Sequence, residues 1–503
     1  MKRLILGIFL GITMVFQGEL PAQEKNLELL LKTDGENVSG QSLLSEIYRK
    51  NVSSVVYVTG INVVPAKKSL EEFFQPQPGT AEDYTVGTGF LIHPAGYVLT
   101  NAHSVMRSVV PIVELRNGSR YEAQIVSIRP HEDLALLKIE ARESLQGVEF
   151  EKNEELHVGD TIVTIGCPHG LKYTLTYGII SGMNRGSQVV DIPGLTLKNL
   201  LQTDAAINPG SSGGPWFNLR GKVMGMTVSK RGDSDNIGFG ISLATLHRVL
   251  PQMLGEWIHS RWQLGLEVAE VSSLLPCRVA SVGADSPASK AGLETGDLFY
   301  SVDEKRIWNP LDFYLALLGK KEGETICLKV IPASEVARRP SSDTLTQTTS
   351  SVDSAEVAHP LSDTTWLPQK LKTCEWTLAE KEPVESAGVI RERLGLEVAS
   401  LTETEFQNER LRTPTGVRIT NVEERLYARL EHTPRPGDIL ARVNYHRPQS
   451  PEHLAEILAT LPEEQPLDLV ILRAETVEQK RHFTRIDVNR FPGREKEVES
   501  ADK

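Results

Sequence analysis

Three residues of this chain have types that together could cleave a peptide bond: His103, Asp133 and Ser212. A serine hydroxyl is a weak nucleophile at neutral pH, so it needs a base to remove its proton and a further group to orient that base. The imidazole of His103 can serve as the base, and the carboxylate of Asp133 can orient it. The three residues therefore predict nucleophilic catalysis by Ser212.

Ser212 lies in the glycine-rich segment DAAINPGSSGGP of residues 204–215. A glycine two residues before the nucleophile lets the backbone bend so that the N–H groups of Gly210 and Ser212 point at one spot, where they can bind a developing oxyanion. Gly213 and Gly214 leave the following backbone bare, so that a substrate strand can approach. In this register the nucleophile is Ser212 and not Ser211.

Each of these residues also has a simpler interpretation. GSSGG can be an ordinary turn, His103 a structural histidine at a strand end, and Asp133 a turn residue before a buried strand. The context favours catalysis, because two apolar runs around a Pro-Ala-Gly turn end just before His103, Asp133 opens the run LALLKI, and a strand-like run covers residues 222–228. All three residues would then lie at strand ends, where a β scaffold holds catalytic groups.

Five segments resemble, in order, the signature blocks of the HtrA (DegP-like) serine proteases: GTGFLIHPAGYVLTNAH, HEDLALLKI, TIGCPHGLKYTLTYGIISG, QTDAAINPGSSGGP and IGFGIS. The resemblance covers about residues 45–250. It implies a mainly β fold with a two-barrel, chymotrypsin-like protease domain. It also implies His103 as general base, Asp133 as orienting acid and Ser212 as nucleophile.

Three positions depart from the family's pattern. Ser211 stands where the family usually has asparagine, Cys167-Pro168-His169-Gly170 stands where it has Asn-Pro-Phe-Gly, and Ser104-Val105 stands where two valines follow TNAH. None of these changes removes a triad residue.

The substrate pocket is predicted to be apolar and shallow. In trypsin-like enzymes an acidic residue six positions before the nucleophile selects Lys or Arg, but here that position is Ala206, followed by Ile207, with Phe239 on the far wall. Burying an unpaired Lys in such a pocket would be unfavourable. We therefore expect cleavage after Val, Ala or Ile.

Composition indicates a globular protein of about three domains, with 503 residues of which 40% are hydrophobic and 24% charged. The net charge of −12 argues against nucleic acid as a partner. Four cysteines (Cys167, Cys277, Cys327 and Cys374) are too few for a disulfide framework; Cys327 and Cys374 could become neighbours, with free buried thiols as the alternative. No cysteine or histidine cluster suggests a metal, and we expect no cofactor.

Residues 2–16 combine Lys-Arg with the apolar run LILGIFLGITMVF, and a short polar stretch ends at Pro21-Ala22. This pattern predicts a signal peptide over residues 1–22, because a membrane span needs roughly 18 or more apolar residues. The alternative is an uncleaved anchor. In either case the bulk of the chain would lie in the periplasm or cell envelope.

A repeat organises the second half of the chain. LGLEVA at residues 264–269 recurs at residues 394–399, and both copies continue with a strand-like run, a Gly-Asp pair, a helix that opens with proline and a final strand. The two copies look like the PDZ domains that the HtrA family carries after its protease. The resemblance implies that Leu264-Gly265-Leu266 and Leu394-Gly395-Leu396 bind the C-terminal carboxylate of a peptide.

The two copies differ in ways that predict different roles. The helix of the first copy has no histidine at its start to select Ser or Thr, so an apolar C-terminal residue is the expected ligand. Where the first copy has Ala291-Gly292-Leu293, the second has Ala428-Arg429-Leu430. We expect the first to bind peptides better and the second to serve more in assembly.

The first copy also contains an insertion. Residues 334–366 are rich in Ser, Thr, Asp and Pro and predict a disordered loop. Residues 370–378 alternate like a strand, which would pair with residues 326–331 to form a hairpin; the alternative is a domain that ends near residue 333. Residues 481–488 supply the matching strand in the second copy.

Phe73 and Phe74 lie in a predicted loop before the protease core, and exposed paired phenylalanines are unusual on a monomer. The resemblance suggests that this loop reaches a neighbouring subunit in a homo-oligomer built on trimers. Local packing of the loop is the alternative.

The sequence thus predicts an exported, ATP-independent serine endopeptidase, whose substrates by resemblance are unfolded or misfolded envelope proteins. The alternatives are a chaperone or scaffold that mainly binds peptides, and a narrowly specific processing protease. The expected boundaries are a signal peptide (1–22), an N-terminal segment (23–44), a protease domain (45–255), a first PDZ domain (262–382), a second PDZ domain (391–491) and a C-terminal tail (492–503).

Overall fold

The fold comes from a computed structural model. It describes residues 43–62, 84–106, 108–152, 155–188, 196–230, 236–269, 277–336, 371–381, 386–401, 416–423, 427, 433–444, 446, 448–461, 467–477 and 480–490. The predicted signal peptide, the Phe73–Phe74 loop and the C-terminal tail lie outside these residues. The chain divides into two compact units, residues 1–46 and 47–503, and only the first turn of helix α3 (Leu43–Asn51) is described in the first unit.

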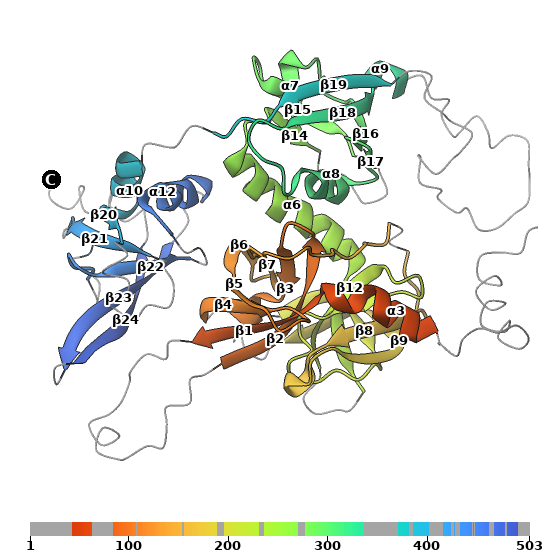
Figure 1. The fold of residues 1–503 in the computed structure, drawn as a ribbon, viewed down its shortest axis with the longest axis horizontal. Coiled ribbons are helices and arrows are strands. Elements are labelled where there is room, and N and C mark those ends of the chain that lie inside the picture. Colours follow the sequence, from red (N-terminus) through yellow and green to blue (C-terminus); the bar gives the residue numbers. More distant parts are fainter. Residues whose placement is uncertain are drawn as a thin grey trace, which may run out of the picture. The chain divides into compact units, whose positions relative to one another are not determined.

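The first half of the predicted protease domain is a seven-stranded sheet in the order β5-β4-β1-β2-β3-β7-β6 (Figure 1). The short strand β3 is buried at all four residues and lies between β2 and β7, which explains its continuous apolar sequence YVLT. The bounds are β1 Val55–Asn62, β2 Tyr84–His93, β3 Tyr97–Thr100, β4 Ser108–Glu114, β5 Arg120–Glu122, β6 Gln124–Arg129 and β7 Leu134–Lys138, with helices η1 Val52–Ser54 and α5 Ala102–Val105.

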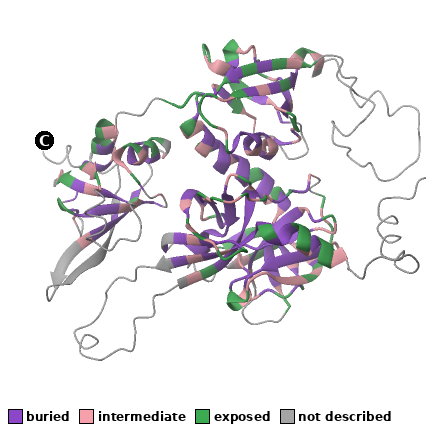
Figure 2. Cartoon of the chain, viewed as in Figure 1, coloured by how far each residue is buried: buried purple, intermediate pink, exposed green. Residues whose placement is uncertain are grey.

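The second half of the predicted protease domain is a closed six-stranded barrel in the order β10-β13-β12-β11-β8-β9. Trp216 is fully buried inside it and donates its indole N–H to the hydroxyl of Thr227 at 2.8 Å. Figure 2 shows buried residues along the strands of both halves. The bounds are β8 Thr161–Gly166, η2 Pro168–Gly170, β9 Thr174–Gln188, β10 Thr196–Thr203, β11 Pro215–Phe217, β12 Val223–Lys230 and β13 Gly238–Ser242, followed by helix α6 Leu243–Arg261.

The first repeat unit has a two-stranded sheet, β14-β15, and a four-stranded sheet in the order β17-β16-β18-β19. Its helix α8 opens with Pro310, and the side chain of Asn309 caps it by accepting the N–H of Asp312 at 3.0 Å. The bounds are β14 Leu266–Val268, β15 Val279–Val282, α7 Pro287–Lys290, β16 Leu298–Val302, β17 Lys305–Arg306, α8 Pro310–Leu317, β18 Thr325–Ile331, α9 Ala333–Val336 and β19 Lys372–Thr377.

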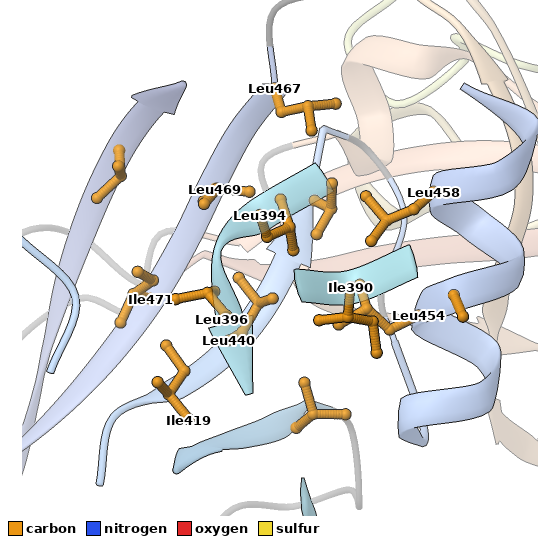
Figure 3. Close-up of a cluster of buried hydrophobic side chains, with 14 of the residues drawn as sticks. Ile390, Leu394, Leu396, Ile419, Leu440, Leu454, Leu458, Leu467, Leu469 and Ile471 are labelled. Atoms are coloured by element: carbon orange, nitrogen blue, oxygen red, sulfur yellow. The ribbon is translucent and has the colours of Figure 1, made fainter. Parts of the chain in front are cut away.

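The second repeat unit has one five-stranded sheet in the order β20-β21-β22-β23-β24. Figure 3 shows its core, in which Ile390 and Leu394 of helix α10 lie beside Leu454 and Leu458 of helix α12. The bounds are α10 Ser386–Leu394, β20 Leu396–Ser400, β21 Val417–Val422, β22 Ile439–Val443, α12 Pro451–Thr460, β23 Leu467–Val477 and β24 Lys480–Arg490.

The repeated Gly-Asp pair has the same structure in both units. Gly296 and Gly437 have φ values of 90° and 94°, which favour glycine. The buried carboxylate of Asp297 accepts the N–H of Glu294 at 3.1 Å, and that of Asp438 accepts the N–H of Arg435 at 2.8 Å. The repeated sequence therefore encodes a repeated turn before the third strand. The mainly β fold is confirmed, and the sheets of the two repeat units are consistent with the predicted PDZ domains.

The late strands are confirmed and three expected limits need adjustment. Strand β19 pairs with β18 from Thr325–Thr377 to Val330–Lys372, so the predicted hairpin forms across the insertion. Residues 334–336 belong to α9 rather than to the loop, α6 continues beyond residue 255, and α10 begins before residue 391. Of the helices that the structure describes, none is both long and apolar enough to span a membrane.

Candidate active site

The imidazole of His103 is held by Asp133 at the end of the first sheet. His103 Nδ1 lies 2.8 Å from Asp133 Oδ2, and the His103 backbone N–H donates to Asp133 Oδ1 at 3.0 Å. The carboxylate is fully buried and the imidazole is 10% exposed. An ionised carboxylate only accepts hydrogen bonds, so Nδ1 must carry the proton, which leaves Nε2 as a base.

The backbone at Asp133 is held by hydrogen bonds, as its side chain is. Asp133 has a φ of 56°, a left-handed conformation that aspartate tolerates better than most residues. Its carbonyl oxygen accepts the N–H of Ala102 at 3.1 Å and the side-chain amide of Asn101 at 3.0 Å. The two residues that precede the predicted base are therefore tied to the orienting aspartate.

The two consecutive serines differ in their surroundings, and the difference supports Ser212 as the nucleophile. Ser211 is 6% exposed, and its Cβ lies near the backbone of Gly166. Its hydroxyl accepts the N–H of Asn208 at 3.4 Å. Ser212 is partly exposed. The hydroxyl of Ser211 is thus used inside the loop, whereas Ser212 is the more exposed of the two serines.

Two glycines allow the serine loop to approach the histidine segment. A Cβ on Gly87 would lie 2.7 Å from Ser104 Oγ and 3.4 Å from the carbonyl oxygen of Ser212. A Cβ on Gly213 would lie 2.0 Å from the carbonyl oxygen of Thr88, and Gly213 has a φ of 86°. Only glycine fits at these contacts, so the sequence brings the loop of Ser212 against the strands that precede His103.

The backbone of the serine loop has the arrangement of an oxyanion site. Gly210 has a φ of 93°, and a Cβ there would lie 2.6 Å from the carbonyl oxygen of Cys167. The carbonyl oxygen of Pro209 accepts the N–H of His169 at 2.8 Å. Because the C=O and N–H of one peptide unit point in opposite directions, the N–H of Gly210 points away from His169. Within the described part of the chain, neither the Gly210 N–H nor the Ser212 N–H has a hydrogen-bond acceptor. Both are therefore available to an oxyanion.

The loop that contacts Pro209 is anchored by a buried carboxylate that the sequence analysis did not single out. Glu114 on β4 pairs with Lys172, and it accepts the side-chain N–H of Arg120 at 2.9 Å. Burial alone would raise the pKa of Glu114, but the hydrogen bonds from Lys172 and Arg120 outweigh burial and lower its pKa. The ammonium of Lys172 also lies 4.8 Å from the ring centre of Tyr57. Since these residues are far apart in sequence, no local pattern could reveal the cluster.

The predicted pocket residues lie near one another but differ in exposure. Ala206 is exposed, while Ile207 and Phe239 are each 7% exposed. A Cβ on Gly238 would lie 2.6 Å from Ile207 Cγ1, so Ile207 packs against the strand that carries Phe239. No member of this set is charged, in keeping with the predicted apolar pocket.

The two predicted carboxylate loops have similar backbone conformations but differ in the hydrogen bonding of the glycine N–H group. Gly265 and Gly395 have φ values of 70° and 64°, and each accepts an N–H at its carbonyl oxygen at 2.9 Å, from Gly283 and Glu423 respectively. The N–H of Gly395 donates to the backbone carbonyl oxygen of Arg391 at 2.8 Å and so ends helix α10. Among the described residues, the N–H of Gly265 has no acceptor. The first loop also lines a cavity of about 1670 Å³.

The four thiols are free. Cys374 pairs with Leu328 and Cys327 pairs with Glu375, so the two cysteines are one residue out of register on neighbouring strands. Their side chains lie on opposite faces of the sheet, and the suggested Cys327–Cys374 neighbourhood does not give a disulfide.

Burial raises the pKa of the Cys167 thiol, which keeps it protonated and a poor nucleophile beside the serine loop. In the described ranges no group of His, Cys, Asp or Glu is placed to hold a metal ion.

Comparison with known proteins places this chain among peptidases. The family described as "Trypsin-like peptidase domain" matches residues 87–226. A probable periplasmic serine endoprotease DegP-like from Pseudomonas fulva is 30% identical over 84% of this chain and 87% of its own length. The protein of the same description from Ectopseudomonas mendocina is 28% identical over 93% of this chain and 95% of its own.

A solved serine endoprotease from Yersinia pestis aligns with 67% of this chain and 98% of its own, at 25% identity and a TM-score of 0.33. The assignment rests on the relatives that match most of this chain and most of their own length. The extent of their match, together with the protease fold described above, shows that this chain belongs to the DegP-like (HtrA) family of serine endoproteases.

Proposed function

We propose that this protein hydrolyses peptide bonds in unfolded or misfolded proteins of the periplasm, with Ser212 as nucleophile, His103 as general base and Asp133 as the group that orients the base. The observation that carries the assignment is the contact of 2.8 Å between His103 Nδ1 and Asp133 Oδ2. It prepares Nε2 to take the proton of a serine that the glycine-rich loop presents. The periplasmic location follows the names of the relatives.

In the proposed reaction, Ser212 Oγ attacks the carbonyl carbon of the scissile bond while His103 Nε2 takes its proton. The N–H groups of Gly210 and Ser212 stabilise the oxyanion of the tetrahedral intermediate. His103 then gives the proton to the leaving amine, and an acyl-enzyme remains on Ser212. A water molecule, deprotonated by the same imidazole, releases the acyl group as a carboxylate.

The repeat domains are assigned to substrate capture. A peptide that adds as a strand beside β14 would place its C-terminal carboxylate at Leu264-Gly265-Leu266, where the Gly265 N–H has no acceptor among the described residues. The equivalent N–H of Gly395 already donates to the backbone carbonyl oxygen of Arg391, which supports a lesser role for the second loop. A signal peptide over residues 1–22 and a homo-oligomer built on trimers complete the proposal.

The test is digestion of an unfolded casein substrate by the mature protein and by matched serine variants. Ser212→Ala should reduce turnover by on the order of 10⁶-fold, because the triad acts as a unit. Ser211→Ala should keep most activity, because it lacks only a hydrogen bond inside the loop. Retained digestion by Ser212→Ala would contradict the assignment. An inactive wild-type protein that still prevents casein aggregation would favour the chaperone alternative.

A further inference from the structure

Thr88 on β2 makes contacts that neither the triad nor the oxyanion donors account for. Its side-chain hydroxyl donates to the carbonyl oxygen of Gly210 at 2.7 Å and accepts the N–H of Cys167 at 2.9 Å. Its backbone N–H donates to the carbonyl oxygen of Ser212 at 2.7 Å. The residue is fully buried. One residue of the first sheet therefore bonds to both residues that supply the oxyanion donors.

These bonds matter because they help to fix the orientation of the peptide units in the serine loop. An N–H group is fixed in direction when the carbonyl of the same planar peptide unit is fixed. The carbonyl of Pro209 is held by the His169 N–H at 2.8 Å, and that of Ser211 by the Gly214 N–H at 3.0 Å. These two units carry the N–H groups of Gly210 and Ser212.

In the two remaining units of the loop, the N–H groups donate to the carbonyl oxygens of Asn208 and Thr227, and Thr88 holds both carbonyls. The carbonyl of Gly210 is held by its hydroxyl, and the carbonyl of Ser212 by its N–H. The same hydroxyl fixes Cys167, two residues before the His169 N–H that holds Pro209. Thr88 thus links the serine loop to the loop at residues 167–170.

Thr88 is itself held in place. Its carbonyl oxygen accepts the hydroxyl of Thr100 at 2.7 Å. A Cβ on Gly213 would lie 2.0 Å from that same carbonyl oxygen, so the serine loop packs directly on it. The hydroxyl of Thr88 has one proton and that proton is used, which makes its direction unambiguous.

We infer that Thr88 is a positioning residue for the oxyanion hole, and that its hydroxyl keeps the N–H groups of Gly210 and Ser212 aimed at the reacting carbonyl. This inference rests on the proposed function of Ser212. Thr88 does not touch substrate, so it acts only through the loop. Loss of its hydroxyl should therefore destabilise the transition state, in which the oxyanion forms, and leave substrate binding unchanged.

The experiment compares Thr88→Val, which replaces the hydroxyl by a methyl group of similar size, with Thr88→Ser, which keeps the hydroxyl. A methyl group needs about 3.5 Å from oxygen and cannot donate, so it pushes the Gly210 carbonyl away. We expect Thr88→Val to lower kcat on a fluorogenic peptide by about 10- to 100-fold, less than the ~10²- to 10³-fold loss of a donor itself. KM should stay within about twofold, since ground-state binding is unchanged. Thr88→Ser should keep kcat within about threefold of wild type, because a hydroxyl donor remains.

A second readout separates positioning from a structural role. A peptide aldehyde forms a hemiacetal with the serine and places an oxyanion in the hole, so its inhibition constant should rise in proportion to the loss of kcat. Binding of the uncleaved peptide to full-length Thr88→Val/Ser212→Ala should match binding to Ser212→Ala. The matched control is Thr227→Val, which also removes a buried threonine hydroxyl but one bonded to Trp216. It should lower the unfolding temperature and leave kcat within about threefold, because valine keeps the backbone hydrogen bonds of residue 227 to Gly213 and Gly214 and loses only the bond to Trp216.

Three results would overturn the inference. They are equal losses of kcat in Thr88→Val and Thr88→Ser, a change in KM alone, and aldehyde inhibition that stays unchanged. If Thr88→Val does not fold, Thr88→Ala takes its place, and failure of both to fold would assign the hydroxyl to stability and also overturn it. Ser212→Ala is assayed in parallel, because activity in that variant would contradict the proposed nucleophile itself and not the role of Thr88.

Discussion

The carboxylate of Asp133 holds His103 by two atoms at once, with Oδ1 on the backbone N–H at 3.0 Å and Oδ2 on Nδ1 at 2.8 Å. Asp133→Asn would keep one oxygen but replace the other by an NH₂ group. If the NH₂ group faces Nδ1, the imidazole must carry its proton on Nε2 and can no longer act as a base. We expect kcat to fall on the order of 10⁴-fold while the fold is retained.

The control for this variant is Asp160→Asn. The half-buried Asp160 carboxylate accepts the N–H of His157 at 2.8 Å, and asparagine can keep that bond. Steady-state kinetics with circular dichroism would check both variants. Full activity in Asp133→Asn would show that the observed pair does not orient the base.

Glu114 should make the protease domain sensitive to acid. Its pKa is lowered in the folded protein, so its stabilising effect is present above the ordinary carboxyl pKa of about 4.3 and is lost as pH falls through the lowered value. Glu114→Gln resembles the protonated form. We expect it to have a lower Tm than wild type at pH 7, with the difference shrinking toward zero as pH falls below about 4.

Thermal unfolding followed from pH 7 to pH 3 would measure this difference. Glu140→Gln is the matched control, because Glu140 pairs with Lys138 while its own side chain is 91% exposed. Its Tm should differ little from wild type at any pH. A Glu114→Gln difference that stays constant with pH would mean that the charge of Glu114 does not stabilise the loop.

Cleavage should occur after small or branched apolar residues. Ala206, Ile207 and Phe239 carry no charge that could pair with a Lys or Arg side chain of a substrate. Mass spectrometry of casein fragments should therefore show mainly Val, Ala or Ile before the cut. Ala206→Asp should shift some cleavage toward Lys and Arg, and a wild-type preference for basic residues would disprove the apolar pocket.

The insertion in the first repeat unit should be dispensable for folding. Because β18 and β19 pair directly, a short Gly/Ser turn in place of residues 337–366 should preserve the hairpin, and loop closure depends only weakly on length. Limited proteolysis of the wild-type chain should cut first in this segment. Loss of the domain's unfolding transition in the shortened variant would show that the insertion is structural.

Peptide binding should depend on the first carboxylate loop more than on the second. A Cβ on Gly265 would lie 2.1 Å from Ser286 Cβ, so Gly265→Ala should distort the loop and weaken binding of a peptide ending in Val or Phe. Gly395→Ala should leave that binding intact. Fluorescence titrations would use full-length Ser212→Ala protein. Equal binding of the C-terminally amidated peptide would rule out capture of the carboxylate.

The parts that the sequence predicted well are those with local signals. Asp133 opens an apolar run that forms β7, and the alternating residues 372–377 form β19 against β18. The glycines of the serine loop indicated the bend at Gly210, because few other residues reach a φ of 93°.

What the sequence could not show depends on distant contacts and on register. Thr88 and Gly210 are 122 residues apart, and Lys172 and Glu114 are 58 residues apart, so no short pattern joins them. A shift of one residue between β18 and β19 decides whether Cys327 faces Cys374, and alternation alone does not fix that shift. Helix α10, which uses the N–H of Gly395, likewise had no counterpart in the repeat pattern.

The most direct test of the central claim is to find which serine an active-site reagent modifies. A fluorophosphonate reacts with an activated serine hydroxyl, and tandem mass spectrometry of the labelled full-length protein locates the adduct. We predict one adduct, on Ser212, absent from His103→Ala because the hydroxyl then lacks its base. An adduct on Ser211, or labelling of Ser212 that does not depend on His103, would contradict the account.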